Sequence, residues 1–326
     1  MTTYQESGVS IDAGNELVQR IKKIVSSSPL SSKAIGGFSG LFPLPKPLNS
    51  YYLSGCCDGV GTKLKIAFLL DRHDTVGIDL VAMNVNDLIC TGAKPLFFLD
   101  YFACGKLDVD LAEKVILGIQ KGCAESNCAL LGGETAEMPG FYKEGEYDLA
   151  GFALGLLNKK SLLKKERIKQ GDCLLGIPSS GLHSNGYSLV RKVFSEDELK
   201  KYGEELIAPT KIYVKKILSL LNKSFGKSVK GIAHVTGGGW YENILRVFPK
   251  GFGIQIKKGS WKIQEIFERI QSQGNISDQE MFRTFNMGIG LILVVSKEQA
   301  SKVMDFLGNA VLLGEVKKGK EEVRFT

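Results

Sequence analysis

The stretch Cys57-Asp58-Gly59-Val60-Gly61-Thr62-Lys63 sets a carboxylate and an ammonium group around two glycines, directly after an apolar segment. Glycine lets backbone N–H groups approach a bound oxyanion because no Cβ stands in the way. A carboxylate in the same turn would repel a phosphate unless a cation lay between them, so the pattern indicates Mg²⁺ bridging to a nucleotide. We expect Asp58 to hold the metal and Lys63 to neutralise phosphate charge, while the amides of the turn, at Gly59, Gly61 and Thr62, face the phosphate.

The motif is neither of the two common glycine-rich nucleotide signatures. The spacing G-x-x-x-x-G-K-[ST] is absent from the chain, and Leu64 stands where the third glycine of G-x-G-x-x-G would be. Phosphate binding must therefore follow another scheme. The alternative interpretation is structural, with Asp58 capping a helix and Lys63 exposed to solvent.

A second carboxylate, Asp87, lies inside the apolar run 79–89 together with Asn86. An ionised carboxylate among apolar neighbours is costly unless it is paired or bound to a cation. We weigh two explanations equally, which are metal ligation and a buried hydrogen bond to a loop backbone.

Two further glycine segments lie in the first half. Gly132 and Gly133 precede Glu134 just after an apolar strand, where α/β proteins collect ligand groups, although a plain turn explains the glycines equally well. Gly36, Gly37 and Phe38 belong to a glycine-rich segment with two phenylalanines that could close over a nucleotide.

Two of the three histidines lie in glycine turns of the second half. His183 stands in the turn 180–186 and His234 begins the turn 234–239. Each could be a satisfied core residue, yet a glycine loop offers little core, so contact with a substrate is an equal alternative.

Length and periodicity predict two domains of α+β or α/β type, because 326 residues exceed the size at which one core stops growing. The short basic stretch 158–170 separates them, and we place the boundary near 166, giving domains 1–166 and 167–326. In the first domain the patterns predict strands at 51–57, 95–104, 128–131 and 147–157, and a helix at 108–126. In the second they predict strands at 173–177, 252–257, 289–296 and 310–316, and helices near 185–194, 210–222, 241–248, 261–273 and 297–309.

Composition points to a cytoplasmic protein that binds neither membrane nor nucleic acid. The chain is 44% hydrophobic and 24% charged, and its longest apolar stretch, Ile289 to Val295, is too short to span a membrane. The polar N-terminus does not resemble a secretory signal, and the seven cysteines lack disulfide or zinc-site spacing. The net charge is +7, but the lysines are spread over many segments as on a solvated surface.

Taken together, the ordered segments resemble the phosphoribosylformylglycinamidine cyclo-ligase family, also called aminoimidazole ribonucleotide synthetase. The resemblance covers nearly the whole chain and runs through residues 8–15, 36–42, 58–63, 77–87, 92–101, 132–140, 181–189, 234–239 and 285–290. Departures from the family pattern occur at Ser10, Ser39 and Trp240.

The resemblance implies ATP-dependent ring closure of formylglycinamidine ribonucleotide to aminoimidazole ribonucleotide in purine biosynthesis, with ATP and Mg²⁺ as cofactors and K⁺ left open. It implies a homodimer whose N-terminal sheets form a barrel across the two chains, and an active site between the two domains. The expected metal ligands are Asp58, Asp87 and Glu134, the expected catalytic residues are His183, His234 and Lys63, and the expected nucleotide-binding residues are Gly36, Gly37, Phe38, Asp58, Gly59, Gly61, Thr62, Lys63, Asn86, Asp87, Gly132, Gly133 and Glu134.

Other members of the same superfamily are weaker matches. A selenophosphate synthetase would have a reactive cysteine near residue 20, where this chain has Arg20, and the two histidine loops are not expected of thiamine-monophosphate kinase. A nucleotide-binding regulatory subunit without turnover is the alternative from another class. ATP hydrolysis that depends on substrate would separate it from the enzyme.

Overall fold

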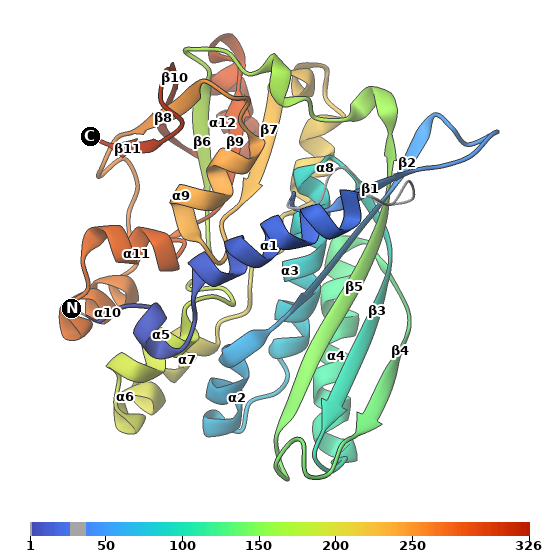
Figure 1. Ribbon diagram of the computed structural model, residues 1–326, viewed down its shortest axis with the longest axis vertical. Helices are drawn as coiled ribbons and strands as arrows, with labels where there is room; N and C mark the ends of the chain where they lie inside the picture. The colour runs from blue at the N-terminus through green and yellow to red at the C-terminus, as the bar shows by residue number, and fades with distance from the viewer. Residues whose placement is uncertain (1, 27–36) are drawn as a thin grey trace.

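The computed structural model describes residues 2–26 and 37–326 and contains two mixed β-sheets (Figure 1). The first sheet has the strand order β1-β2-β5-β3-β4, in which β3 and β4 are parallel and the other neighbours antiparallel. Its strands are β1 (Gly40–Pro43), β2 (Tyr51–Gly59), β3 (Lys94–Cys104), β4 (Ala129–Glu137) and β5 (Tyr147–Asn158). The four strands expected in the first half are confirmed, and β1 is an addition at the edge.

Helices α3 (Val76–Cys90) and α4 (Val109–Ser126) cover one face of this sheet (Figure 1). Their axes approach closely at Gly77, where a Cβ would lie 2.2 Å from the carbonyl oxygen of Val115. Asp108 caps α4 by accepting a hydrogen bond from the Leu111 amide at 3.0 Å, as expected for an N-terminal aspartate. Two further helices, α1 (Ile11–Ser26) and α2 (Leu64–Leu70), complete the first half.

The second sheet has the order β11-β8-β10-β6-β9-β7, with β11 and β8 parallel and the other neighbours antiparallel. Its strands are β6 (Cys173–Pro178), β7 (Val229–His234), β8 (Phe252–Ile256), β9 (Ile289–Val295), β10 (Val311–Lys318) and β11 (Val323–Phe325). The helices of this half are α5 (Tyr187–Val193), α6 (Glu196–Lys201), α7 (Gly203–Ile207), α8 (Val214–Leu221), α9 (Gly239–Asn243), α10 (Glu265–Gly274), α11 (Asp278–Thr284) and α12 (Ala300–Leu307).

Helix α3 joins the two halves, because it contacts strands of the first sheet and also β7 and α8. It is buried along nearly its whole length, which explains why its sequence is apolar on all sides. Its polar side chains are satisfied on both sides: Asn84 donates to the carbonyl oxygens of Asp58 and Leu80, and Asn86 donates to that of Lys211. The helix therefore carries residues 79–87 into the space between the sheets.

Both sheets are open, with β1 and β4 at the edges of the first and β11 and β7 at the edges of the second. Neither sheet closes on itself, and the expected barrel across two chains stays a prediction. The connection between the sheets consists of the short 3-10 helices η3 (Lys159–Ser161) and η4 (Lys165–Arg167). In the part of the chain that the structure describes, no helix is both long enough and apolar enough to cross a membrane.

Candidate active site

Asp58, Asp87 and His234 converge between the two sheets from three elements. Asp58 lies near the end of β2, Asp87 in the last turns of α3, and His234 at the end of β7. The Nδ1 atom of His234 lies 2.9 Å from Oδ1 of Asp87. The partner of Asp87 is therefore the His234 side chain and not the loop backbone that was the alternative. This hydrogen bond joins the two halves of the chain at two residues that the sequence had singled out separately.

The environment of Asp58 disfavours its charge. Burial, and next the negative charge of Asp87, raise the pKa of Asp58 from 3.8 to about 6, although the Gly59 amide donates to its Oδ1 at 2.8 Å. The carboxylates of Asp58 and Asp87 thus lie close enough to repel each other, and the Asp58 carboxylate is largely shielded from water. This is the electrostatic situation that a divalent cation relieves.

The hydrogen bond that Asp87 accepts sets the tautomer of His234. A carboxylate accepts the proton on Nδ1, which leaves Nε2 of a neutral imidazole as an acceptor. Nε2 is buried and has no hydrogen-bond partner among the described residues. The ring therefore holds one unused basic nitrogen beside the two carboxylates.

His183 lies near His234 in the turn that follows β6. Its backbone has φ +62°, and its Nε2 accepts a hydrogen bond from the Ser180 amide at 3.3 Å. Burial lowers the pKa of His183 well below 6.5, and the charge of His234 contributes in the same direction. Its Nδ1 is buried without a partner among the residues that the structure describes, so His183 adds a second unused ring nitrogen.

Asn286 fixes the His183 turn. Its amide donates to the Gly181 carbonyl at 2.8 Å, and its Oδ1 accepts from the Gly288 amide at 2.8 Å and from the Ser179 hydroxyl at 3.1 Å. Trp240 in turn donates from Nε1 to the Asn286 carbonyl at 3.0 Å and stacks on Trp261. Trp240, a departure from the family pattern, is thus a buried support for the loops around the site.

Lys63 is fully buried and forms an ion pair with Asp79 at 2.9 Å. Its Nζ also donates to the Ala208 carbonyl at 2.7 Å, and burial lowers the pKa of its ammonium group. The alternative of an exposed lysine is wrong. In this structure the ammonium group joins η2 (Gly61–Lys63), α3 and the loop before α8, and its role at a phosphate stays a prediction.

The turn before Lys63 contacts the second half of the chain through a pair of hydroxyl groups. The hydroxyls of Thr62 and Ser188 lie 3.1 Å apart, and Gly61 adopts φ +68°, which glycine permits. Asn86 uses both ends of its amide, donating to the Lys211 carbonyl and accepting from the Tyr213 amide at 3.0 Å. It therefore holds the loop before α8, and its role at a nucleotide stays a prediction.

Glu134 lies apart from the other two predicted metal ligands. Asp58, Gly151, Asp100 and Gly133 follow one another across four adjacent strands, so β4 is three strand spacings, about 14 Å, from Asp58. Glu134 is exposed, as are Gly132 and Gly133. No group of three or more metal-ligating side chains forms within residues 2–26 and 37–326.

Of the N-terminal glycine segment, Gly36 lies outside the described residues. Gly37 is exposed, and the Phe38 ring contacts the guanidinium of Arg246, whose carbon lies 5.4 Å from the ring centre. Ser39, another departure from the family pattern, lies 2.9 Å from the Ser54 hydroxyl.

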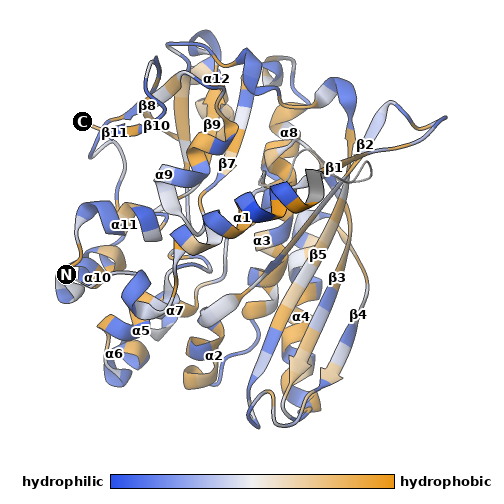
Figure 2. Cartoon of the chain, in the orientation of Figure 1, coloured by the Kyte–Doolittle hydropathy of each residue, from blue (hydrophilic) through white to orange (hydrophobic). Residues whose placement is uncertain are grey.

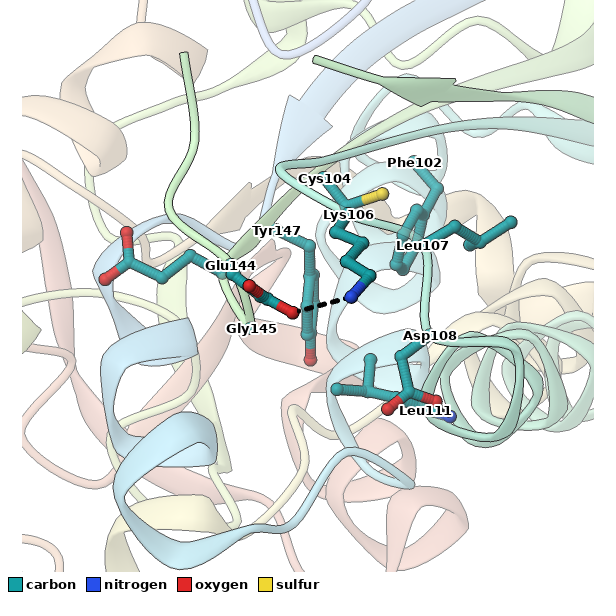
Figure 3. Close-up of a pocket in the computed structure, with 10 residues that line it drawn as sticks. Phe102, Cys104, Lys106, Leu107, Asp108, Leu111, Glu144, Gly145 and Tyr147 are labelled. Carbon is teal, nitrogen blue, oxygen red and sulfur yellow. Dashed lines mark hydrogen bonds and ion pairs between the residues drawn. The ribbon is translucent and has the colours of Figure 1, made fainter. Parts of the chain in front are cut away.

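A pocket of about 260 Å³ lies at the end of β3, under the start of α4 (Figure 3). Its floor is apolar, with Phe102 stacked on Tyr147, and its rim carries Lys106 paired with Glu144 at 2.9 Å. None of the predicted site residues lines it.

Sequence reasoning missed the residues that hold the site together, chiefly Asp79, Asn84 and Asn286. Asp79 accepts from Lys63, from the Thr210 amide at 2.7 Å and from the Ser184 hydroxyl at 3.2 Å. Asp79 and Asn84 carry the same sequence signal as Asp87, because each is a polar residue inside the apolar run 79–89.

Comparison with known proteins places the chain in a family. The model of the AIR synthase related protein N-terminal domain matches residues 46–157, and that of the C-terminal domain matches residues 169–326. Two similar relatives, both named phosphoribosylformylglycinamidine cyclo-ligase, come from Arabidopsis thaliana and Caldicellulosiruptor saccharolyticus. The first, a chloroplastic protein, is 54% identical over 97% of this chain and 82% of its own length, and the second is 51% identical over 98% of each.

Solved structures share the fold at low sequence identity. The HypE-HypF complex matches with a TM-score of 0.68, 18% identity and 95% of each chain. The structure of AaThiL complexed with AMPPCP and TMP matches with a TM-score of 0.65, 18% identity, 95% of this chain and 92% of its own. With the two-domain fold and the long matches to curated relatives, the chain belongs to the phosphoribosylformylglycinamidine cyclo-ligase family of AIR synthase related proteins.

Proposed function

We propose that the cluster of Asp58, Asp87 and His234 is the reaction centre of an ATP-dependent cyclo-ligase. The enzyme converts formylglycinamidine ribonucleotide to aminoimidazole ribonucleotide and releases ADP and phosphate. The observation that carries the function is identity above 50% to proteins of that name over nearly the full chain. The hydrogen bond between Asp87 and His234, which joins the two halves, supports the location.

The chemistry explains why ATP is needed. The formyl amide oxygen is a poor leaving group, and transfer of the γ-phosphoryl group to it gives an imidate-like intermediate. The amidine nitrogen of the same molecule then attacks the activated carbon, and phosphate leaves. Because the attack is intramolecular, the protein gains most by holding ATP and the folded substrate in register.

The two carboxylates fit a divalent cation. The negative charges of Asp58 and Asp87 repel each other, and burial further disfavours the charge on Asp58. A cation bound between them would therefore lower the electrostatic cost of both charges. We propose that Asp58 and Asp87 hold Mg²⁺, which would neutralise the phosphate oxygens of ATP. K⁺ and a contribution from Glu134 are not needed by this scheme.

His234 is proposed to handle the proton of ring closure. Its Nδ1 is engaged by Asp87, so Nε2 can accept a proton from the attacking amidine nitrogen. His183, kept neutral by burial, is the second candidate for proton transfer, as a donor from Nδ1, because its Nε2 accepts from the Ser180 amide. Replacing the true base with Ala should slow turnover by roughly 10² to 10⁴-fold while ATP-analogue binding is kept.

The test of the function is stoichiometric. Phosphate release from ATP should require formylglycinamidine ribonucleotide and should yield one aminoimidazole ribonucleotide per phosphate. Phosphate release at full rate without the amidine would indicate an ATPase or a kinase for another acceptor. A complete lack of turnover with intact ATP-analogue binding would favour a regulatory subunit.

The open face of the first sheet supports a homodimer. Leu99 and Phe152 are cross-strand partners, Phe152 is 42% exposed, and Leu131 on the edge strand is 65% exposed. Figure 2 shows apolar colour along β3 and β5. Pairing of two such faces would bury this surface and form the barrel. We also propose that the chain divides into domains 1–166 and 167–326 at the connection between the sheets.

A further inference from the structure

A second pocket, of about 330 Å³, lies where the chain crosses from the first sheet to the second, at the upper end of the molecule in Figure 1. It is bounded by the start of β3, the end of β5, the connection through η3 and η4, the end of α8 and the start of β7. Its volume falls in the range of small-molecule sites, about 300–1,000 Å³.

This pocket is distant from the proposed reaction centre. Val229, which lines it, begins the strand that ends at His234 five residues later, a separation of about 17 Å along the strand. Asn158, on β5, is seven residues from Gly151, the cross-strand partner of Asp58, and that separation is about 23 Å. The pocket is therefore a separate site on the same rigid strands.

The rim of the pocket is cationic. Its four charged residues are Lys94, Lys160, Arg167 and Lys227, and no carboxylate is among the described residues that line it. None of these four cations forms an ion pair within the part of the chain that the structure describes. Four positive charges without counter-charges repel one another, so an anion bound among them would be stabilised.

Arg167 is already fixed in place. Its guanidinium donates from Nη2 to the Lys227 carbonyl, which ties η4 to the turn before β7. A guanidinium has five N–H donors, so several remain for a ligand, and less side-chain entropy is lost when an anion binds.

The floor of the pocket is apolar. It is made by seven aliphatic residues, which are Leu156, Leu157, Leu162, Leu163, Leu218, Leu221 and Val229. A simple inorganic anion would bind to the cations and would leave the apolar floor exposed to water. A ligand with both a charged group and a flat apolar group would use both parts of the site.

We propose that this pocket binds a nucleoside monophosphate, with the phosphate among the four cations and the base against the leucine floor. A phosphate monoester carries about −1.5 to −2 charges at pH 7, which suits a cluster of this size better than a carboxylate does. The site is distinct from the proposed ATP site and does not depend on the cyclo-ligase activity.

Calorimetric titration of the full-length protein tests the proposal, with the ATP analogue AMPPCP and Mg²⁺ present at saturation to block the ATP site. AMP should bind at one site per chain, inorganic phosphate at least tenfold more weakly, and adenosine more weakly still. Affinity for AMP should fall as salt is raised, because exposed charges are screened. Adenosine binding as well as AMP, or phosphate binding as well as AMP, would overturn the assignment.

Charge reversal locates the site. The double variant Lys160→Glu/Lys227→Glu should weaken AMP binding at least tenfold without changing AMPPCP binding. The matched control Lys121→Glu/Lys250→Glu alters two exposed lysines that do not line the pocket, and it should bind AMP as the parent does. Unchanged AMP affinity in the first variant, or equal loss in both, would refute this location.

Discussion

Asp87 shows how one residue can be identified from sequence while its partner cannot. A carboxylate inside an apolar run must be compensated, and this much follows from residues 79–89 alone. The compensation is the imidazole of His234, which is 147 positions away and reaches Asp87 only because β7 packs against α3. Pattern analysis nominated both residues, but only the fold pairs them.

Replacing Asp87 with Asn should weaken Mg²⁺-ATP binding by about tenfold or more, because one of two carboxylates proposed to face the cation is lost. The amide can still accept from His234, so the fold should be kept. Titration of an ATP analogue with and without Mg²⁺ measures the effect, and Asp110→Asn, an exposed change on α4, is the control. Unchanged affinity in a folded Asp87→Asn protein would reassign this residue to a structural role.

His183 should make the protein less stable in acid. Its pKa is depressed by burial, so the unfolded state binds a proton that the native state refuses. The free energy of unfolding contributed by this group is present above pH 6.5 and is lost as the pH falls below that value. The variant His183→Asn introduces a residue that tolerates the left-handed backbone at this position. Its free energy of unfolding, measured with urea, should fall less steeply between pH 7.5 and 5.5 than that of the parent. Equal slopes for the variant and the parent would contradict the depressed pKa.

At the scale of elements, the buried pair of Lys63 and Asp79 ties η2 to α3, and through Ala208 and Thr210 to the loop before α8. Both side chains are inaccessible to water, so removing one leaves the other charge uncompensated.

Lys63→Met should therefore lower the free energy of unfolding by about 3–5 kcal/mol. Lys65→Met, which breaks a partly exposed pair with Glu146, should cost about 0–1 kcal/mol. Urea unfolding of both variants provides the comparison. A cost for Lys63→Met no greater than that for Lys65→Met would mean that the buried pair is not needed for the fold.

Local patterns predicted the elements whose signals are local. The helix behind Asp108 is confirmed as α4, and the apolar run rich in aromatic residues after residue 94 is confirmed as β3. Strand β7 was missed because Gly231 and Lys230 interrupt its apolar pattern. The charge of Lys230 is tolerated because its ammonium lies 2.6 Å from Asp172 inside the protein, a long-range pair that no local window reveals.

At the candidate active site too, local sequence patterns identify single residues but not the long-range contacts between them. Its glycine turns, acids and histidines could be nominated because each stands out in its own segment. The engagement of Lys63 by Asp79 and the distance of Glu134 depend on which elements pack together. For Glu134 the strand order of the first sheet decides, because β5 and β3 lie between β2 and β4.

At the scale of the whole molecule, the helices of the described ranges 2–26 and 37–326 that cover the first sheet, α3 and α4, lie on one face. The other face carries Leu99, Phe152 and Leu131, and although an antiparallel sheet can leave one face in water, exposed apolar side chains on that face mark an interaction surface. The second sheet contains the fully buried strand β9, whose seven residues are all inaccessible. The contrast between the sheets points to the first as the surface for a second copy of the chain.

We therefore expect sedimentation at micromolar concentration to give a mass near twice 35.6 kDa. Phe152→Glu should shift the protein toward the monomer, because it places a charge in the centre of the apolar face, where desolvation is costly. Leu312→Glu is the matched control, since Leu312 is similarly exposed, at 48%, but lies on β10 of the second sheet. A monomeric parent protein at this concentration would rule out the barrel across two chains, and dissociation by Leu312→Glu instead would place the interface on the other half of the molecule.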